Sequence, residues 1–186
     1  MNTIVENAWA LAKEAHEGQK RRYTNEEYFT HCEAVALRVS QAGCDEETIA
    51  GALLHDTLED TTLDPERIRK YCGSRVLSMV KLMTDCKLDV GNRAARKRID
   101  RQRLASGDMA VHTIKCSDGL DNLASILEHD KPIAVLYVQE LKLTHEVLRL
   151  AKPDIWLEFG QALAAGQRVL EEAQLDANLQ PKWVTP

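Results

Sequence analysis

The chain has few of the residues that mark secreted, fibrous or disordered proteins. Its 186 residues include only five cysteines, nine glycines and five prolines. The cysteines are odd in number and form no Cys-x-x-Cys pair, so we expect reduced thiols and no zinc knuckle. So little glycine and proline excludes a low-complexity chain. A hydrophobic content of 44% is enough to build the core of one ordinary domain.

Long hydrophobic runs and targeting signals are missing as well. No window approaches about 18 uncharged apolar residues, so we expect no membrane-spanning helix. The first 18 residues include Glu6 and Glu14, and no basic segment precedes an apolar core, which argues against a signal peptide. We therefore expect a cytoplasmic protein.

Positive charge is scarce overall and concentrated in one place. The formal net charge of −5 disfavours a general binder of duplex DNA. Six lysines and arginines nevertheless lie within residues 91–103, together with one acidic residue. This run is either a solvated helix face or a rim that attracts phosphates, with Arg93 and Lys97 as the expected pair. It contains no aromatic residue that could stack on bases, so we expect no nucleic-acid partner.

Apolar residues recur at helical spacing through nearly the whole chain, and no segment shows sustained two-residue alternation. The class is therefore predicted to be all-α. One helix is expected to begin after Asp45 and to run without a break to residue 60. The other predicted helices cover 3–18, 29–42, 62–71, 73–83, 91–105, 109–127, 132–151 and a last segment from 153, followed by an irregular tail at 176–186.

A polar group interrupts the apolar helix predicted after Asp45. In the segment LLHDTLEDT, residues four apart share a helix face, which places His55 under Glu59 and Asp56 under Asp60. Burying one imidazole and three carboxylates is costly unless a metal ion compensates them. Both ligand types suit manganese, iron or zinc. The alternative is a solvated charged face.

A second apolar helix carries Lys115, Asp118 and Asn122 on one side. These residues suit a phosphate contact, a metal ligand and a hydrogen-bond donor, although a Lys–Asp pair with a capping role would leave the same pattern. A histidine at the start of the helix at 29–42 is, by itself, more typical of a packed residue. Together, these helices offer four metal ligands with open coordination positions: His31, His55, Asp56 and Asp118.

The order His, His-Asp, Asp resembles the HD-domain metal-dependent phosphohydrolases. The segments AHEGQKRRYTNEEYFTH, ALLHDTLEDT and IKCSDGLDNL are similar to the hydrolase domain of RelA/SpoT proteins, and most of all to the small alarmone hydrolases such as the metazoan SpoT homologues. The similarity runs from Ala12 to Leu150. It implies a helical bundle at 1–150 with a metal site between helices, and a C-terminal helix and tail at 151–186 packing on the same domain.

The resemblance also implies an activity, which is the removal of the 3′-pyrophosphate of (p)ppGpp in a manganese-dependent reaction. The four ligands above would hold Mn²⁺ or another divalent metal. Glu59 and Asp60 would orient and deprotonate the attacking water. The residues expected to contact the purine nucleotide are Arg21, Arg22 and Asn122, with Lys115, Arg93 and Lys97 near its phosphates.

Two segments depart from the family pattern. The sequence has Asn25-Glu26-Glu27-Tyr28 where Gly-Glu-Pro-Tyr is usual, and Asp118-Gly119-Leu120-Asp121-Asn122 where Asp-Arg-Leu-His-Asn is usual. The base therefore stays open between a guanine and an adenine alarmone. Another HD-type nucleotide phosphohydrolase (a 5′-nucleotidase or dNTPase) and a non-catalytic nucleotide-binding regulatory module are the alternatives, and the sequence leaves homo-oligomer formation undecided.

Overall fold

The computed structural model describes residues 3–87 and 89–175, and within these ranges it contains ten α-helices and no strand. The all-α prediction is confirmed. The expected irregular tail lies outside the described residues. The helices are α1 (Ile4–Ala15), α2 (Phe29–Gln41), α3 (Glu46–Leu54), α4 (Thr57–Asp60), α5 (Pro65–Cys72), α6 (Ser74–Met83), α7 (Arg93–Leu104), α8 (Met109–His129), α9 (Lys131–Val147) and α10 (Pro153–Leu175).

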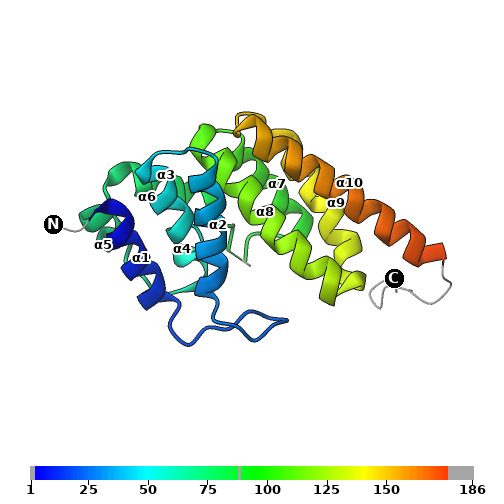
Figure 1. The fold of residues 1–186 in the computed structure, drawn as a ribbon, viewed down its shortest axis with the longest axis horizontal. Helices are drawn as coiled ribbons and strands as arrows, with labels where there is room; N and C mark the ends of the chain where they lie inside the picture. The colour runs from blue at the N-terminus through cyan, green and yellow to red at the C-terminus, as the bar shows by residue number, and fades with distance from the viewer. Residues whose placement is uncertain (1–2, 88, 176–186) are drawn as a thin grey trace.

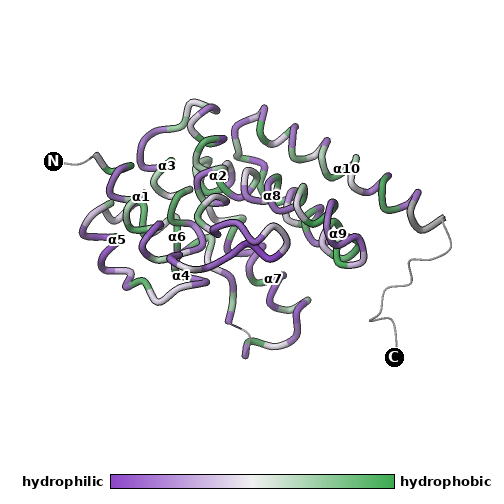
Figure 2. The backbone as a smooth tube through the Cα atoms, turned by 60° about the horizontal axis from the view of Figure 1, so that its bottom comes forward, coloured by the Kyte–Doolittle hydropathy of each residue, from purple (hydrophilic) through white to green (hydrophobic). Residues whose placement is uncertain are grey.

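Helix α8 runs through the middle of the bundle and contacts helices from both ends (Figure 1). Helices α2, α3 and α6 pack on it from the N-terminal end, and α9 and α10 pack on it from the other end. Hydrophobic and hydrophilic stretches alternate along α10, as expected for a helix that buries one face (Figure 2). None of the described helices is long and apolar enough to cross a membrane.

The prediction of one unbroken helix from Asp45 to residue 60 is wrong in its second half. Asp45 does cap α3, since its carboxylate accepts a hydrogen bond of 2.8 Å from the Thr48 amide. However, α3 ends at Leu54 and α4 begins at Thr57. The ring Nδ1 of His55 donates to the Ala52 carbonyl at 2.8 Å, and the Thr57 hydroxyl donates to the Leu54 carbonyl at 2.7 Å. Side chains thus take carbonyls that a continuing helix would use.

The C-terminal helix α10 packs closely on α8 at Gly119. Phe159 of α10 is fully buried, and a Cβ atom at Gly119 would lie 2.5 Å from its Cζ atom. Real Cβ atoms do not approach another carbon so closely, and the ring has no solvent side toward which to move. The missing side chain at Gly119 is therefore a packing requirement.

We expect Gly119→Ala to destabilise the protein. Overpacking costs about 1–3 kcal/mol, against a gain of about 1 kcal/mol in helix propensity. The net loss of up to about 2 kcal/mol should lower Tm by up to about 8 °C. Thermal unfolding measures it. The double variant with Phe159→Leu should lose less stability than the two single changes summed, and strict additivity would contradict the contact.

Candidate metal centre and adjoining cavities

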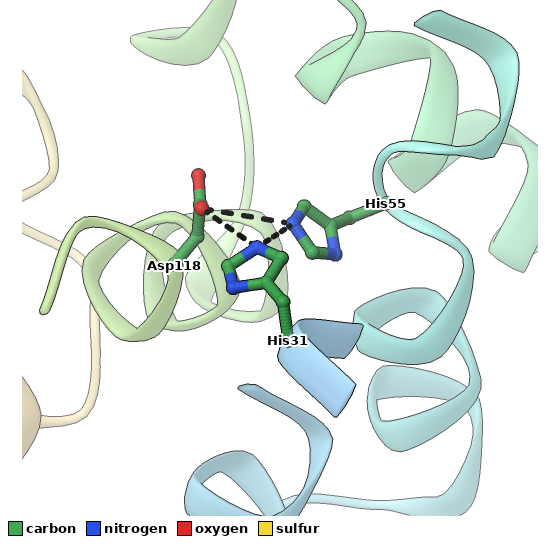
Figure 3. A group of neighbouring side chains, drawn as sticks. All are labelled: His31, His55 and Asp118. Atoms are coloured by element: carbon green, nitrogen blue, oxygen red, sulfur yellow. Dashed lines mark hydrogen bonds and ion pairs between the residues drawn. The ribbon is translucent and has the colours of Figure 1, made fainter. Parts of the chain in front are cut away.

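Three buried side chains from different parts of the chain point at one another (Figure 3). His31 lies in the first turn of α2, His55 directly follows α3, and Asp118 lies near the middle of α8. The Nε2 atoms of the two histidines are 3.3 Å apart. Asp118 Oδ1 lies 3.3 Å from the His31 nitrogen and 3.7 Å from the His55 nitrogen. The group is compact enough for one ion to touch all three donors.

The hydrogen bonds on the far side of each ring show what the facing nitrogens present. His55 Nδ1 donates to the Ala52 carbonyl, and His31 Nδ1 donates to Asp121 Oδ2 at 2.7 Å. In a neutral imidazole, the Nε2 atom then carries a lone pair. Two lone pairs that face each other at 3.3 Å repel unless a cation lies between them. Nitrogen and carboxylate donors arranged in this way fit a divalent metal ion.

The fourth predicted ligand, Asp56, lies beside this group. Its Oδ2 atom is 3.1 Å from His55 Nε2 and 3.6 Å from His31 Nε2. The same oxygen accepts a hydrogen bond of 2.6 Å from the Tyr28 hydroxyl. Tyr28 was not singled out as a site residue from the sequence, although its position three residues before His31 places it one turn away. The hydroxyl fixes the direction in which the Asp56 carboxylate points.

The residues predicted to share a face with Asp118 do so. Lys115 Nζ donates to Asp118 Oδ2 at 2.6 Å, and Asn122 Nδ2 donates to Asp118 Oδ1 at 2.6 Å. Burial opposes ionisation of Asp118, but Lys115 and the two histidines outweigh it and hold the pKa of this carboxyl well below its usual range. Burial lowers the pKa of His55, but Asp56 and Asp118 reverse this shift and raise it. The local field therefore favours positive charge between these side chains.

A cavity of about 230 Å³ opens beside the cluster, and Glu59 and Asp60 stand in its wall. Glu59 Oε2 accepts a hydrogen bond of 2.9 Å from the Asp85 amide. Burial in the cleft and the Asp85 carboxylate raise the pKa of Glu59 to about 7, although the side chain stays accessible to solvent. Burial and Asp56 also raise the pKa of Asp60. The Glu59 carboxylate can therefore accept and release a proton near neutral pH.

A second cavity, of about 340 Å³, adjoins the first. Arg21 and Arg22 line it, and the Arg22 guanidinium lies 5.3 Å from the centre of the Tyr23 ring. Three residues, one just before α2, one in α8 and one in α9, line both cavities, so the two spaces are neighbours, and together they are called the cleft here. These shared residues are Tyr28, Asn122 and Tyr137.

The predicted pair Arg93 and Lys97 is divided between two acidic partners. Arg93 Nε and Nη2 bind the Glu140 carboxylate at 2.7 and 2.8 Å, while Lys97 forms an ion pair with Asp85. Lys97 lines the first cavity and Arg93 the second. The two charges therefore border the cleft, but each is already engaged. The partner Asp85 comes from a loop and has no sequence pattern that would reveal it.

Comparison with known proteins places these features in a family. The HD domain family matches residues 8–151, and the chain belongs to it. A guanosine-3′,5′-bis(diphosphate) 3′-pyrophosphohydrolase of Aquifex aeolicus is 37% identical over 123 residues, which is 66% of this chain and 18% of that protein. A GTP pyrophosphokinase rsh of Brucella melitensis is 32% identical over 138 residues, covering 71% of this chain and 18% of its own length.

The chain thus spans less than a fifth of the length of these curated relatives. A solved structure covers far more of the fold. It is that of a metazoan ortholog of SpoT that hydrolyzes ppGpp, and it superposes with a TM-score of 0.80 at 25% identity. The match covers 91% of this chain and 98% of that chain. The resemblance expected from the sequence motifs is therefore confirmed.

We expect His55→Ala to abolish the thermal stabilisation that a divalent metal gives. At free Mn²⁺ of 100 times Kd, binding adds about 2.7 kcal/mol, or roughly 5–10 °C in Tm for a domain of this size. His112→Ala is a matched control, because His112 is equally buried but bonds the Leu104 carbonyl and the Leu150 amide instead. It should lower Tm and keep the metal increment. A full increment in His55→Ala would remove His55 from the ligand set.

Proposed function

We propose that the chain is a metal-dependent phosphohydrolase that removes the 3′-pyrophosphate from a purine alarmone nucleotide, (p)ppGpp or its adenine counterpart. The observation that carries this proposal is the facing pair of imidazole nitrogens with Asp118, directly beside Glu59 in the cleft. The activities named for the Aquifex relative and for the metazoan SpoT ortholog support the same substrate class. We assign the hydrolase domain to 1–150 and an extension to 151–186, of which the described helix α10 packs on α8 and α9.

The proposed metal ligands are His31, His55, Asp56 and Asp118, and the proposed metal is Mn²⁺. When bound, such an ion lowers the pKa of a coordinated water and offsets charge on a phosphoryl oxygen. The protein supplies the orientation. Lys115 and Asn122 hold the Asp118 carboxylate from two sides, and Tyr28 holds Asp56. These contacts keep the donors in place before any substrate enters.

Glu59 is the proposed general base. Its carboxylate lies in the cavity wall, is oriented by the Asp85 amide, and has a pKa near the pH at which the reaction would run. It removes the proton of the water that attacks the phosphorus on the ribose 3′ oxygen. The bond between that phosphorus and the 3′ oxygen breaks, and the 3′ oxygen takes up a proton as the nucleoside 5′-diphosphate leaves. Asp60, in the same wall, orients that water.

The second cavity is the proposed site of the nucleoside. Arg22 and Arg21 lie where they could contact the base and sugar, and Asn122 stands between the two cavities. Lys115, at the metal end, is placed to offset charge on the departing pyrophosphate. Lys97 and Arg93 border the cleft and contribute to its field at the substrate phosphates, and their acidic partners reduce this contribution.

The function is tested by incubating the Mn²⁺-loaded chain with ppGpp, ppApp, deoxynucleoside triphosphates and nucleoside 5′-monophosphates. We expect pyrophosphate and a nucleoside 5′-diphosphate from one or both alarmones. Tripolyphosphate from deoxynucleoside triphosphates, or orthophosphate from monophosphates, would instead favour another HD-type phosphohydrolase. Tight alarmone binding without any product would favour a regulatory module.

Glu59→Gln separates chemistry from binding. We expect kcat to fall by about 10²–10⁴-fold, the usual contribution of general-base catalysis, because the amide cannot accept the proton. Mn²⁺ affinity should stay close to that of the wild type, since Glu59 is not among the proposed ligands. Steady-state kinetics and a metal titration measure the two effects. Full kcat in Glu59→Gln would move the base elsewhere, with Asp60→Asn as the next variant to examine.

The pH profile should report the raised pKa of Glu59. A general base works when deprotonated, so kcat/KM should rise with pH up to about 7 and then level off. Asp85→Asn removes a negative charge that raises this pKa, so the rising limb should move to lower pH. Profiles of both proteins at saturating metal measure the shift. A limb that stays in place, or moves upward, would contradict the assignment.

A further inference from the structure

One carboxylate oxygen joins the proposed metal centre to the loop that borders the second cavity. Asp121 Oδ2 accepts a hydrogen bond from His31 Nδ1 at 2.7 Å and another from Arg21 Nη1 at 2.7 Å. Asp121 lies three residues after Asp118, so both carboxylates project from the same side of α8. Helix α8 therefore touches His31 twice, through Asp118 at one ring nitrogen and through Asp121 at the other.

The contact with His31 sets the chemical form of that ring. A carboxylate can only accept, so Nδ1 carries a proton, and the neutral ring then presents the lone pair of Nε2 to His55 and Asp118. A carboxylate behind a metal-binding imidazole also makes the opposite nitrogen a stronger ligand, and the loss of such a partner typically costs 10–100-fold in metal affinity. An ion pair between Arg21 and Asp121 alone, without the bond to His31, would neither fix the tautomer of His31 nor strengthen its Nε2 atom as a ligand.

The contact with Arg21 reaches the other end of the cleft. Arg21 belongs to the loop between α1 and α2, whose ends are held by two backbone bonds, from the Arg21 amide to the Glu26 carbonyl and from the Tyr28 amide to the Gln19 carbonyl, both 2.8 Å long. Its guanidinium is mostly buried and lines the second cavity. Whatever moves Arg21 must therefore also move or release the oxygen that holds His31.

We propose that Asp121 is a positioning residue that fixes the tautomer of His31 and couples metal affinity to the Arg21 side chain. The proposal rests on the proposed function only for the identity of the metal site. It implies that Arg21, which does not touch the metal ligands, contributes to metal binding through Asp121. By thermodynamic linkage, a nucleotide that orders Arg21 strengthens metal binding, and the metal strengthens nucleotide binding by the same factor.

The test compares variants of the full chain with Mn²⁺ as the probe. Asp121→Ala removes both contacts, while Asp121→Asn keeps the shape but weakens the acceptor. A chelator-competition titration gives Kd for Mn²⁺, and thermal unfolding without metal gives the stability of the fold. We expect Kd to rise about 10–100-fold in Asp121→Ala and less in Asp121→Asn. In Arg21→Met we expect a several-fold rise.

Tyr23→Phe is the matched control for the loop. The Tyr23 hydroxyl donates to Asp130 Oδ2 at 3.0 Å, so it ties the same loop to the end of α8 without reaching His31. Its Kd for Mn²⁺ should equal that of the wild type.

In Asp121→Asn, kcat at limiting Mn²⁺ should fall and should recover when Mn²⁺ is raised, which a purely structural defect would not do.

Wild-type Kd for Mn²⁺ in both Asp121 variants would overturn the proposal, whether or not the unfolding temperature falls. A rise in Kd for Asp121→Ala with unchanged Kd in Arg21→Met would overturn the coupling to Arg21. These two comparisons of Kd for Mn²⁺ need no turnover of an alarmone. Failure of the proposed activity would instead appear in the substrate panel while these metal affinities still differ.

Discussion

The site depends on two imidazole Nε2 atoms that face each other at 3.3 Å, while the Nδ1 atom of each ring bonds an oxygen on its far side. This arrangement is costly without a cation, and several local features maintain it. The break between α3 and α4 lets His55 donate backward to the Ala52 carbonyl. Asp121 accepts the corresponding hydrogen bond from Nδ1 of His31. Lys115 and Asn122 hold the third donor, Asp118, from either side. Backbone and side-chain contacts of the fold therefore orient the nitrogen and oxygen donor atoms of the site toward one common point.

The charges around the cleft show why metal and substrate should depend on each other. Lys115 is paired with Asp118, Lys97 with Asp85, and Arg93 with Glu140. An incoming polyphosphate therefore meets lysine and arginine side chains whose positive charge is already largely compensated by their acidic partners. A divalent ion in the histidine and aspartate cluster would add positive charge at the metal end of the cleft, close to Lys115. Under the proposed function, attraction of a highly charged nucleotide by an acidic protein relies on that ion as well as on the arginines of the second cavity.

The sequence was sufficient to predict the all-α class and the convergence of His31, His55 and Asp118, because helical periodicity and motif order carry that information. It failed at residues 55 and 56, where side-chain bonds to carbonyls override helix propensity without changing the hydrophobic pattern. The support of Glu59 by Asp85 was also missed, since it joins a helix to a loop far away in sequence. Such contacts depend on tertiary packing, which spacing rules do not describe.

The five residues from Asp118 to Asn122 differ from the pattern of the small alarmone hydrolases at two positions, and the structure gives the two changes separate physical reasons. Gly119 has no side chain because Phe159 of α10 occupies the space where a Cβ would lie. Asp121 supplies an acceptor for His31 and Arg21. Both positions flank Asp118 on α8. Packing of the C-terminal helix and placement of the proposed metal ligand Asp118 therefore meet on the same turn of α8.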